Sequence, residues 1–240
     1  MKTSRRTRGL FFLALPVLAV STARAQTPAA ETEVWPKVKA TFDLRPQTRL
    51  QVFGQLQNGE DFPYIQWNVG AMVNYRMKRI AGRHEADIDD ENEHYLVLGA
   101  GYEYLQTTQS DKTKRENRIV VQGTGRHRPG AGFLLTDRNR IEFRWVSGVY
   151  DFRYRNKLAL NRALRVNKFR FTPYAAGELF WDRNHHSWNE NQYSFGVQLP
   201  YKTRLMLDTY YLHQNCTTCS QQHINVLGLT LNLYFRQKKK

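Results

Sequence analysis

The chain has 240 residues and a formal net charge of +15, with 36 basic and 21 acidic side chains. This length suits a single all-β domain, because sandwiches and barrels of about 200–250 residues are common. No segment reaches about 18 uninterrupted apolar residues, which excludes a predicted transmembrane helix. A basic surplus can indicate nucleic-acid binding, but here the charges alternate along strand-like segments behind an export signal. We therefore predict no nucleic-acid partner.

Residues 1–25 have the features of a secretory signal peptide. Basic residues between Lys2 and Arg8 precede an apolar run over 10–20, and Ala23 and Ala25 form a small-x-small cleavage pattern. A transmembrane helix needs about 20 apolar residues, so this run is too short to anchor the chain. We predict that residues 1–25 are cleaved on export and that residues 26–240 form one domain.

Alternation of apolar and polar residues begins at Val34. Runs with a period of two cover 34–44, 50–56, 67–76, 96–104 and 118–126, with charged or amide residues on the second parity. Such alternation indicates β-strands, because successive side chains of a strand point to opposite faces. Residues 79–93 break the pattern with a cluster of aspartates and glutamates, and we expect them to form a structureless acidic insertion.

The clearest alternation lies between Phe133 and Leu160. Odd positions from Phe133 to Trp145 are mostly apolar, and the even positions between them are mostly charged. After a break at 146–149 the phase is exchanged, so that Phe152 and Tyr154 alternate with arginines. Further runs at 169–181, 193–199, 205–211 and 227–235 bring the total to eleven.

The length of the runs and the aromatics at their ends favour a membrane setting. Membrane strands need about 9–11 residues, whereas soluble strands average about 5–6. Trp67, Trp145 and Tyr150 have the placement of aromatic girdles. The predicted fold is all-β: a membrane-spanning antiparallel up-and-down β-barrel of about 10–12 strands, with apolar side chains facing lipid. Long connections at 58–65, 107–115, 182–191 and 214–222 are expected outside the cell, with the C-terminus in the periplasm.

Three segments carry a resemblance to a known family. Residues 140–144 (Arg-Ile-Glu-Phe-Arg), 152–157 (Phe-Arg-Tyr-Arg-Asn-Lys) and 173–180 (Pro-Tyr-Ala-Ala-Gly-Glu-Leu-Phe) are followed by Tyr210-Tyr211-Leu212 and a closing strand over 223–235. From Trp35 to Phe235 the chain resembles the outer-membrane-barrel family catalogued as domain of unknown function 2490. The resemblance implies a barrel in the bacterial outer membrane and no established activity. The basic tail over 236–240 departs from the terminal aromatic usual in such barrels.

The functional candidates are the charged residues on the inward parity. A positively lined passage attracts anions, because a narrow low-dielectric channel focuses the field. Alternatively these side chains pair across strands and fill the lumen, as in barrels near eight strands. We predict an uncharacterised, non-enzymatic barrel that is structural or forms a narrow pore, with solute binding or adhesion through outer loops as an alternative. The predicted lumen-facing residues are Arg118, Arg126, Arg138, Arg140, Glu142, Arg144, Arg153, Arg155, Arg170 and Glu178.

A second functional alternative is an outer-membrane lipid hydrolase. His185 and Ser187 are similar to the His-x-Ser motif of lipid A deacylases, and Asp182 or Glu190 would have to orient the histidine. The motif falls in a predicted loop, so we expect no enzyme. We also expect no cofactor, and as partners only outer-membrane lipid and the assembly machinery that inserts barrels.

Cys216 and Cys219 form a Cys-x-x-Cys pair. In an exported protein a local disulfide is the favoured interpretation. A metal site is the alternative, and His213 and His223 would have to supply the remaining ligands. We predict the disulfide and no metal.

Overall fold

The computed structural model describes residues 30–59, 64–77, 79–80, 89–109, 112–219 and 221–236. The predicted signal peptide lies outside these residues. The elements are β1 (Glu31–Arg45), β2 (Thr48–Gly59), β3 (Tyr64–Arg76), η1 (Asp90–Glu93), β4 (Leu96–Gln109), β5 (Lys112–Gly130), β6 (Phe133–Val146), β7 (Val149–Arg162), β8 (Leu164–Val166), β9 (Phe169–Asp182), β10 (Ser187–Tyr201), β11 (Leu205–Cys216) and β12 (His223–Phe235).

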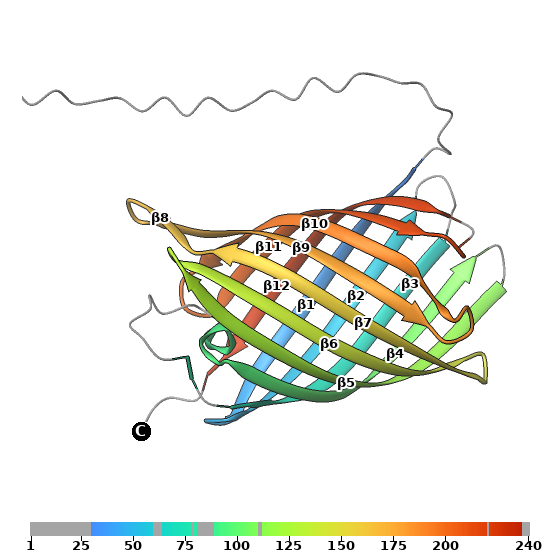
Figure 1. The fold of residues 1–240 in the computed structure, drawn as a ribbon, viewed down its shortest axis with the longest axis horizontal. Coiled ribbons are helices and arrows are strands. Elements are labelled where there is room, and N and C mark those ends of the chain that lie inside the picture. The colour runs from blue at the N-terminus through green and yellow to red at the C-terminus, as the bar shows by residue number, and fades with distance from the viewer. Residues whose placement is uncertain are drawn as a thin grey trace, which may run out of the picture.

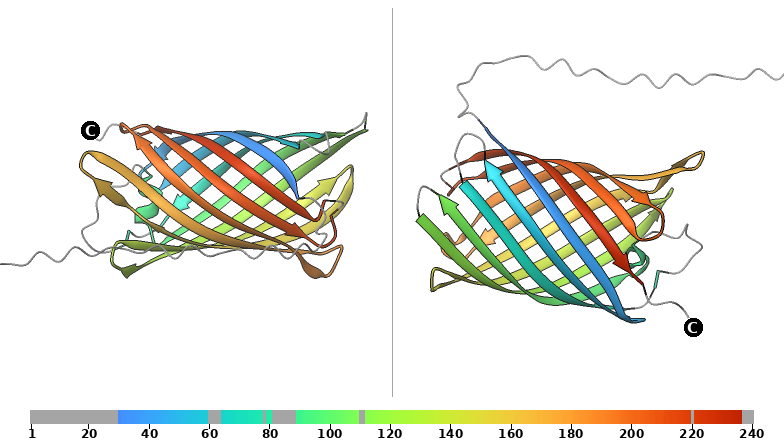
Figure 2. Two further views of the ribbon diagram at one scale, coloured as in Figure 1. Left: turned by 90° about the horizontal axis from the view of Figure 1, so that it is seen from above. Right: turned by 180° about the vertical axis from the view of Figure 1, so that it is seen from behind.

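These strands form a closed barrel, as the alternation predicts (Figure 1). β8 pairs only with the start of β9, so the wall itself has eleven strands, within the predicted range. Neighbours along the chain are antiparallel, but β1 and β12 close the barrel as a parallel pair, with Glu31 opposite Ile224 and Phe42 opposite Phe235 (Figure 2, right). The parallel seam follows from the odd number of strands, because the first and last strands then run in the same direction.

The two faces of the wall have opposite polarity. Outward side chains such as Leu227 and Leu229 are 57% and 47% exposed, whereas the inward Glu142 is fully buried. This is the reverse of a soluble sandwich, and it confirms the predicted assignment of parities to faces. Among the residues described here, no helix has the length and apolar character required to cross a bilayer.

The barrel has two mouths. The disulfide mouth contains 147–148, 183–186, 217–219 and 221–222, and the η1 mouth contains 46–47, 89–95, 131–132, 163–168 and 202–204. Aromatic pairs lie near both mouths. Trp145 contacts Tyr150 near the disulfide mouth, and Phe42 stacks on Phe235 near the η1 mouth. The strands therefore carry aromatics near both ends, as expected for girdles.

Two of the predicted long connections, 107–115 and 182–191, were wrong. β4 and β5 remain paired as far as Gln109 and Lys112, so strands occupy most of the predicted loop 107–115. The short break predicted at 146–149 is a tight hairpin turn, in which Ser147 and Gly148 have φ values of 49° and 88°, a left-handed turn that matches the twist of paired strands. Strand ends beyond the apolar band are polar on both faces, and this removes the alternation that reveals them.

Candidate functional site

The lumen contains a cavity of about 630 Å³ on the side of the disulfide mouth. Its wall carries ten basic and five acidic side chains, so the space has a basic surplus. A separate cleft of about 480 Å³ at the disulfide mouth shares Lys114, Arg144, Arg153 and Cys219 with the cavity, which connects the cavity to that mouth. The basic groups are Lys37, Lys39, Lys114, Arg118, Arg138, Arg140, Arg144, Arg153, Arg155 and Lys157.

Ion pairs hold the arginines along one side of the cavity, the charged wall, which extends from β4 to β9. Arg140 pairs with Glu103 and lies 2.9 Å from Glu142. Arg155 lies 2.9 Å from Glu142 and 2.8 Å from Glu178. The Arg140–Glu142 pair lies within β6, and the other three join strands that are adjacent or next-but-one along the wall. The guanidinium groups consequently lie against the wall and leave the centre of the lumen open.

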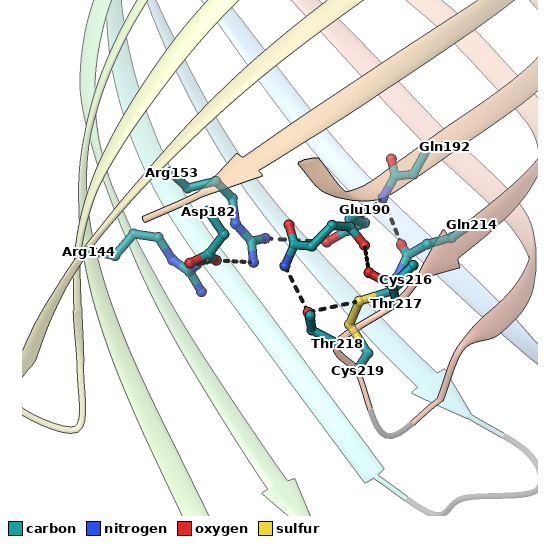
Figure 3. Close-up of a disulfide and its surroundings, with 11 residues drawn as sticks. Arg144, Arg153, Asp182, Glu190, Gln192, Gln214, Cys216, Thr217, Thr218 and Cys219 are labelled. Carbon is teal, nitrogen blue, oxygen red and sulfur yellow. Dashed lines mark hydrogen bonds and ion pairs between the residues drawn. A yellow bond between two sulfur atoms is a disulfide. The ribbon is translucent and has the colours of Figure 1, made fainter. Parts of the chain in front are cut away.

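The same arrangement continues to the disulfide mouth (Figure 3). Arg153 lies between two carboxylates, 3.1 Å from Asp182 and 3.6 Å from Glu190. Arg144 shares Asp182 at 3.5 Å. Both arginines therefore point along the rim at the entrance to the cavity.

The facing side of the cavity carries fewer charges: of the ten basic groups, Lys37 and Lys39 lie there, on β1. It is formed by β1 to β3 and carries amides and apolar groups, among which Gln66 donates to Gln57 at 2.6 Å and accepts from Thr107 at 2.8 Å. Near the middle of the lumen the Tyr174 ring packs on Gly196, where a Cβ would lie 2.6 Å from the ring, and its hydroxyl donates to Asp208 at 3.0 Å. A glycine is needed at position 196 because the tyrosine lies flat against the backbone.

Residues 89–93 of the acidic insertion, which include η1, lie inside the η1 mouth (Figure 1). Arg49 Nη1 lies 2.7 Å from Asp89 Oδ1 and 3.4 Å from Glu91 Oε2, and Arg49 has no exposed surface. Tyr234 donates to Asp89 at 3.3 Å, and Arg128 donates to the carbonyl of Asn92 at 3.5 Å. Because these partners come from β2, β12 and β5, the segment 89–93 spans the mouth. We name it the plug segment.

The expectation of a structureless insertion was therefore wrong for this segment. Asp89 caps η1 by accepting a hydrogen bond from the Glu91 backbone at 3.2 Å, and the His94 backbone donates to the Glu91 carbonyl at 3.1 Å. An acidic run has no hydrophobic period, so its order comes from the basic side chains that surround it inside the barrel.

The two plug carboxylates have shifted pKa values of opposite sign. Burial alone would raise the pKa of Asp89, but the charges of Arg49 and Lys39 and the hydrogen bond from Arg49 hold it at about 2. Burial and the charge of Asp89 raise the pKa of Glu91. Asp89 is thus the firmly ionised partner of Arg49, and Glu91 takes up a proton more readily.

The η1 mouth also has a cleft of about 570 Å³, lined by the hairpin of β8 and β9 and by the turn after β10. No residue lines both this cleft and the lumen cavity. Among the described residues, the cleft at the η1 mouth is thus lined separately from the cavity, whereas the cleft at the disulfide mouth shares four lining residues with it.

Comparison with known proteins gives a family without a function. A family model described as "Protein of unknown function (DUF2490)" matches residues 32–225. The chain belongs to this family. No curated protein sequence matches this DUF2490 member. A solved structure entitled "NanC porin structure in rhombohedral crystal form" is 14% identical in sequence, with a TM-score of 0.39, and the match covers 82% of this chain and 94% of that one.

Most of the predicted lumen residues of the DUF2490 chain come together in the cavity. Arg170 has the inward parity but lies exposed at the η1 mouth, where it lines the separate cleft, because β9 begins only one residue earlier. Arg126 faces inward beside the plug segment, and its charge contributes to the low pKa of Asp89. The others line the cavity or pair with its lining: Arg118, Arg138, Arg140, Glu142, Arg144, Arg153, Arg155 and Glu178.

Sequence reasoning missed the site around Arg49. Lys37, Lys39 and Arg49 alternate correctly in the first two runs, but nothing local marks them as functional. The available signal was charge complementarity, because an acidic run occurs in a chain whose inward parity is predominantly basic.

The structure does not assemble the hydrolase alternative. His185 lies exposed in the turn 183–186, and Ser187 begins β10. No hydrogen bond joins the two side chains in the described residues, and Asp182 and Glu190 are engaged by arginines. The Ser-His-acid geometry that this chemistry requires is not formed.

Cys216 and Cys219 form a disulfide with a Cα–Cα distance of 5.5 Å. Glu190 is the acidic group next to it, with an oxygen within 4.8 Å of both sulfurs. His213 and His223 instead face outward, where each ring bonds to an asparagine, Asn225 at 2.8 Å and Asn215 at 2.7 Å. The histidines therefore do not complete a metal site with the cysteines.

Proposed function

We propose that the protein is a non-enzymatic barrel of the bacterial outer membrane whose lumen admits small anions from the disulfide mouth, and that the plug segment holds this passage closed. The observation that supports it best is a cavity with a basic surplus in a barrel whose opposite mouth holds a buried acidic segment of the same chain.

The membrane setting is supported by the outer face. Exposed valines, leucines and aromatics cover the outward parity of the strands, and aromatic pairs lie near both mouths. Exposing this apolar surface to water is unfavourable, whereas contact with acyl chains suits it. Outer-membrane lipid is therefore the proposed partner of the outer face, and the barrel-assembly machinery is the proposed partner during biogenesis.

The anion preference is supported by the placement of charge. Ten basic groups against five acidic ones line a space with low-dielectric walls, and such a space concentrates anions. The carboxylates of the charged wall fix the arginines in place and neutralise only part of their charge. The plug carboxylates of Asp89 and Glu91 act as a tethered anion at the far end.

Planar-bilayer conductance tests the proposal. The wild-type barrel is expected to pass little steady current, and a variant in which a short Gly-Ser turn replaces residues 81–92 is expected to conduct with anion preference. Adding Arg140→Glu and Arg153→Glu to that variant should move the reversal potential toward cations. Heat-modifiable migration on gels verifies that each variant is a folded barrel. A folded variant without the plug segment that passes no current would contradict the proposal.

A further inference from the structure

A polar cluster interrupts the apolar outer face on β6 and β7, neighbouring strands on the near wall in Figure 1. Asp137, Asn139 and Asn156 all have the outward parity, and Asp137 and Asn139 are exposed. Their outward neighbours on the same two strands are apolar, namely Leu135, Ile141 and Leu158. We name these three residues the outer polar cluster.

The outer polar cluster lies at mid-depth. Asn139 is halfway along β6 between Phe133 and Trp145, and its register partner Asn156 is halfway between Tyr150 and Arg162. The strand distance from Asn139 to either aromatic is roughly 20 Å at about 3.4 Å per residue. For strands tilted by about 45° this is roughly 14 Å along the barrel axis, so the cluster falls in the middle of an apolar band about 25 Å tall.

Hydrogen bonds within the cluster leave one amide donor and one amide acceptor unused. Asn156 Nδ2 donates to Asp137 at 2.7 Å and to Asn139 at 3.1 Å, which uses both of its hydrogens. Asn139 Nδ2 donates once, to Asp137 at 3.3 Å, and its oxygen also accepts from Tyr154. One N–H of Asn139 and the carbonyl oxygen of Asn156 therefore remain unused among the described residues. No described lysine or arginine forms an ion pair with Asp137.

The outer surface beside the cluster has no protruding side chains. On β5 the residues opposite Asn139 and Asp137 are Gly123 and Gly125, which have no side chain to cover the amides. Exposed polar groups in hydrocarbon are unfavourable, and in membrane proteins they usually face protein or water. The flat strip of glycines lets another wall approach closely.

We infer that β5 to β7 form an interface with a second copy of this chain, related by a two-fold axis along the membrane normal. The unused donor on Asn139 and the unused acceptor on Asn156 complement each other across such an axis, and a two-fold interface pairs the same patch on both subunits. Two reciprocal amide hydrogen bonds then form between the walls and exclude lipid from the cluster. The inference rests on the proposed membrane setting and goes beyond the proposed anion passage.

Cysteine cross-linking in lipid vesicles tests the interface. Both native cysteines are in the disulfide, so Leu158→Cys, at an exposed position in register with Asp137, introduces a single thiol next to the cluster and leaves its polar groups intact. Mild oxidation should give a dimer band on a non-reducing gel. The matched control is Val38→Cys, which is exposed at the middle of β1 and should give no such band.

A second variant separates assembly from folding. Asn139→Leu combined with Asn156→Leu should convert a wild-type dimer into a monomer, measured by native mass spectrometry from nanodiscs, while heat-modifiable migration is retained. Wild-type protein that inserts into vesicles but is monomeric, or equal cross-linking at positions 158 and 38, would overturn the interface and leave the membrane proposal intact. Failure of the wild-type chain to insert would overturn both.

Discussion

The two mouths of the barrel place similar charges in opposite arrangements. At the η1 mouth, Arg49 is enclosed by Asp43 from the wall and by Asp89 and Glu91 from a segment that spans the lumen. At the disulfide mouth, Arg144 and Arg153 pair with carboxylates of neighbouring strands and keep 10% and 18% of their side-chain surface exposed. An arginine is therefore enclosed when its acids come from a segment across the mouth, and lines the cavity when its acids lie on the same wall.

The largest expected effect comes from Arg49→Leu. The substitution removes the cation shared by Asp89 and Glu91 from a site in which Arg49 has no exposed surface, and such a change costs about 3–5 kcal/mol. We expect a matching loss in the free energy of unfolding in urea, measured in lipid vesicles. The structure also predicts release of the plug segment, seen as faster proteolysis within 79–93.

The control is Arg79→Leu. Arg79 pairs with Glu93 at 3.3 Å in the same connection, but its side chain is 61% exposed. An exposed pair contributes about 0–1 kcal/mol, so this variant should unfold almost like the wild type. Equal destabilisation by the two substitutions would show that Arg49 does not hold the plug segment.

A smaller effect is expected from Glu142→Gln in the charged wall. Glu142 balances Arg140 and Arg155 at 2.9 Å each, and the amide keeps the shape while removing the charge. We expect a loss of about 1–3 kcal/mol in unfolding free energy, because charged hydrogen bonds become neutral ones. Anion preference should increase in the variant without residues 81–92, since two arginines lose their counter-charge. An unchanged reversal potential would indicate that ions do not pass along this wall.

The smallest expected effect is a pH dependence at the η1 mouth. Glu91 has a raised pKa when docked, so docking becomes more stable as the pH falls through that value and less stable above it. Asp89 acts in the opposite sense, but its contribution is lost only as the pH approaches about 2. Between pH 7.5 and 5, hydrogen-exchange protection of the Asn92 and His94 amides should therefore increase.

The matched variant for this effect is Glu91→Gln, which cannot take up the proton. Its protection factors should be the same at both pH values, after correction for intrinsic exchange. Protection that decreases toward pH 5 in the wild type would contradict the predicted sign.

The wall was predictable from the sequence because each central strand contrasts an apolar face with a charged one. Arg140, Glu142 and Arg155 were placed on the lumen side by parity alone, and the structure has them there. Strand ends such as Gln109 and Lys112 were not predictable, because beyond the apolar band both faces are polar. Arg170 was misplaced for a related reason: parity predicts which face of the wall a side chain occupies, but not how far along the barrel axis it lies.

The docking of the plug segment and the parallel β1–β12 seam could not be predicted from the sequence, because both depend on contacts between distant residues. Asp89 and Glu91 have no periodic signal, and their partner Arg49 is 40 or more positions away in the chain. The eleven runs were counted in the sequence, but an odd count suggests a missing strand when all neighbours are assumed antiparallel. Pairing β1 with β12 in parallel resolves the count without a further strand.

The parallel seam has a consequence for the orientation of the chain. β1 starts at the disulfide mouth with Glu31, and β12 finishes at the opposite mouth with Phe235, whereas an even-numbered barrel starts and finishes on one side. Epitopes inserted directly ahead of Glu31 and directly behind Phe235 would therefore be accessible from different compartments. Protease treatment of intact cells would remove one and spare the other, and so report which mouth faces the medium.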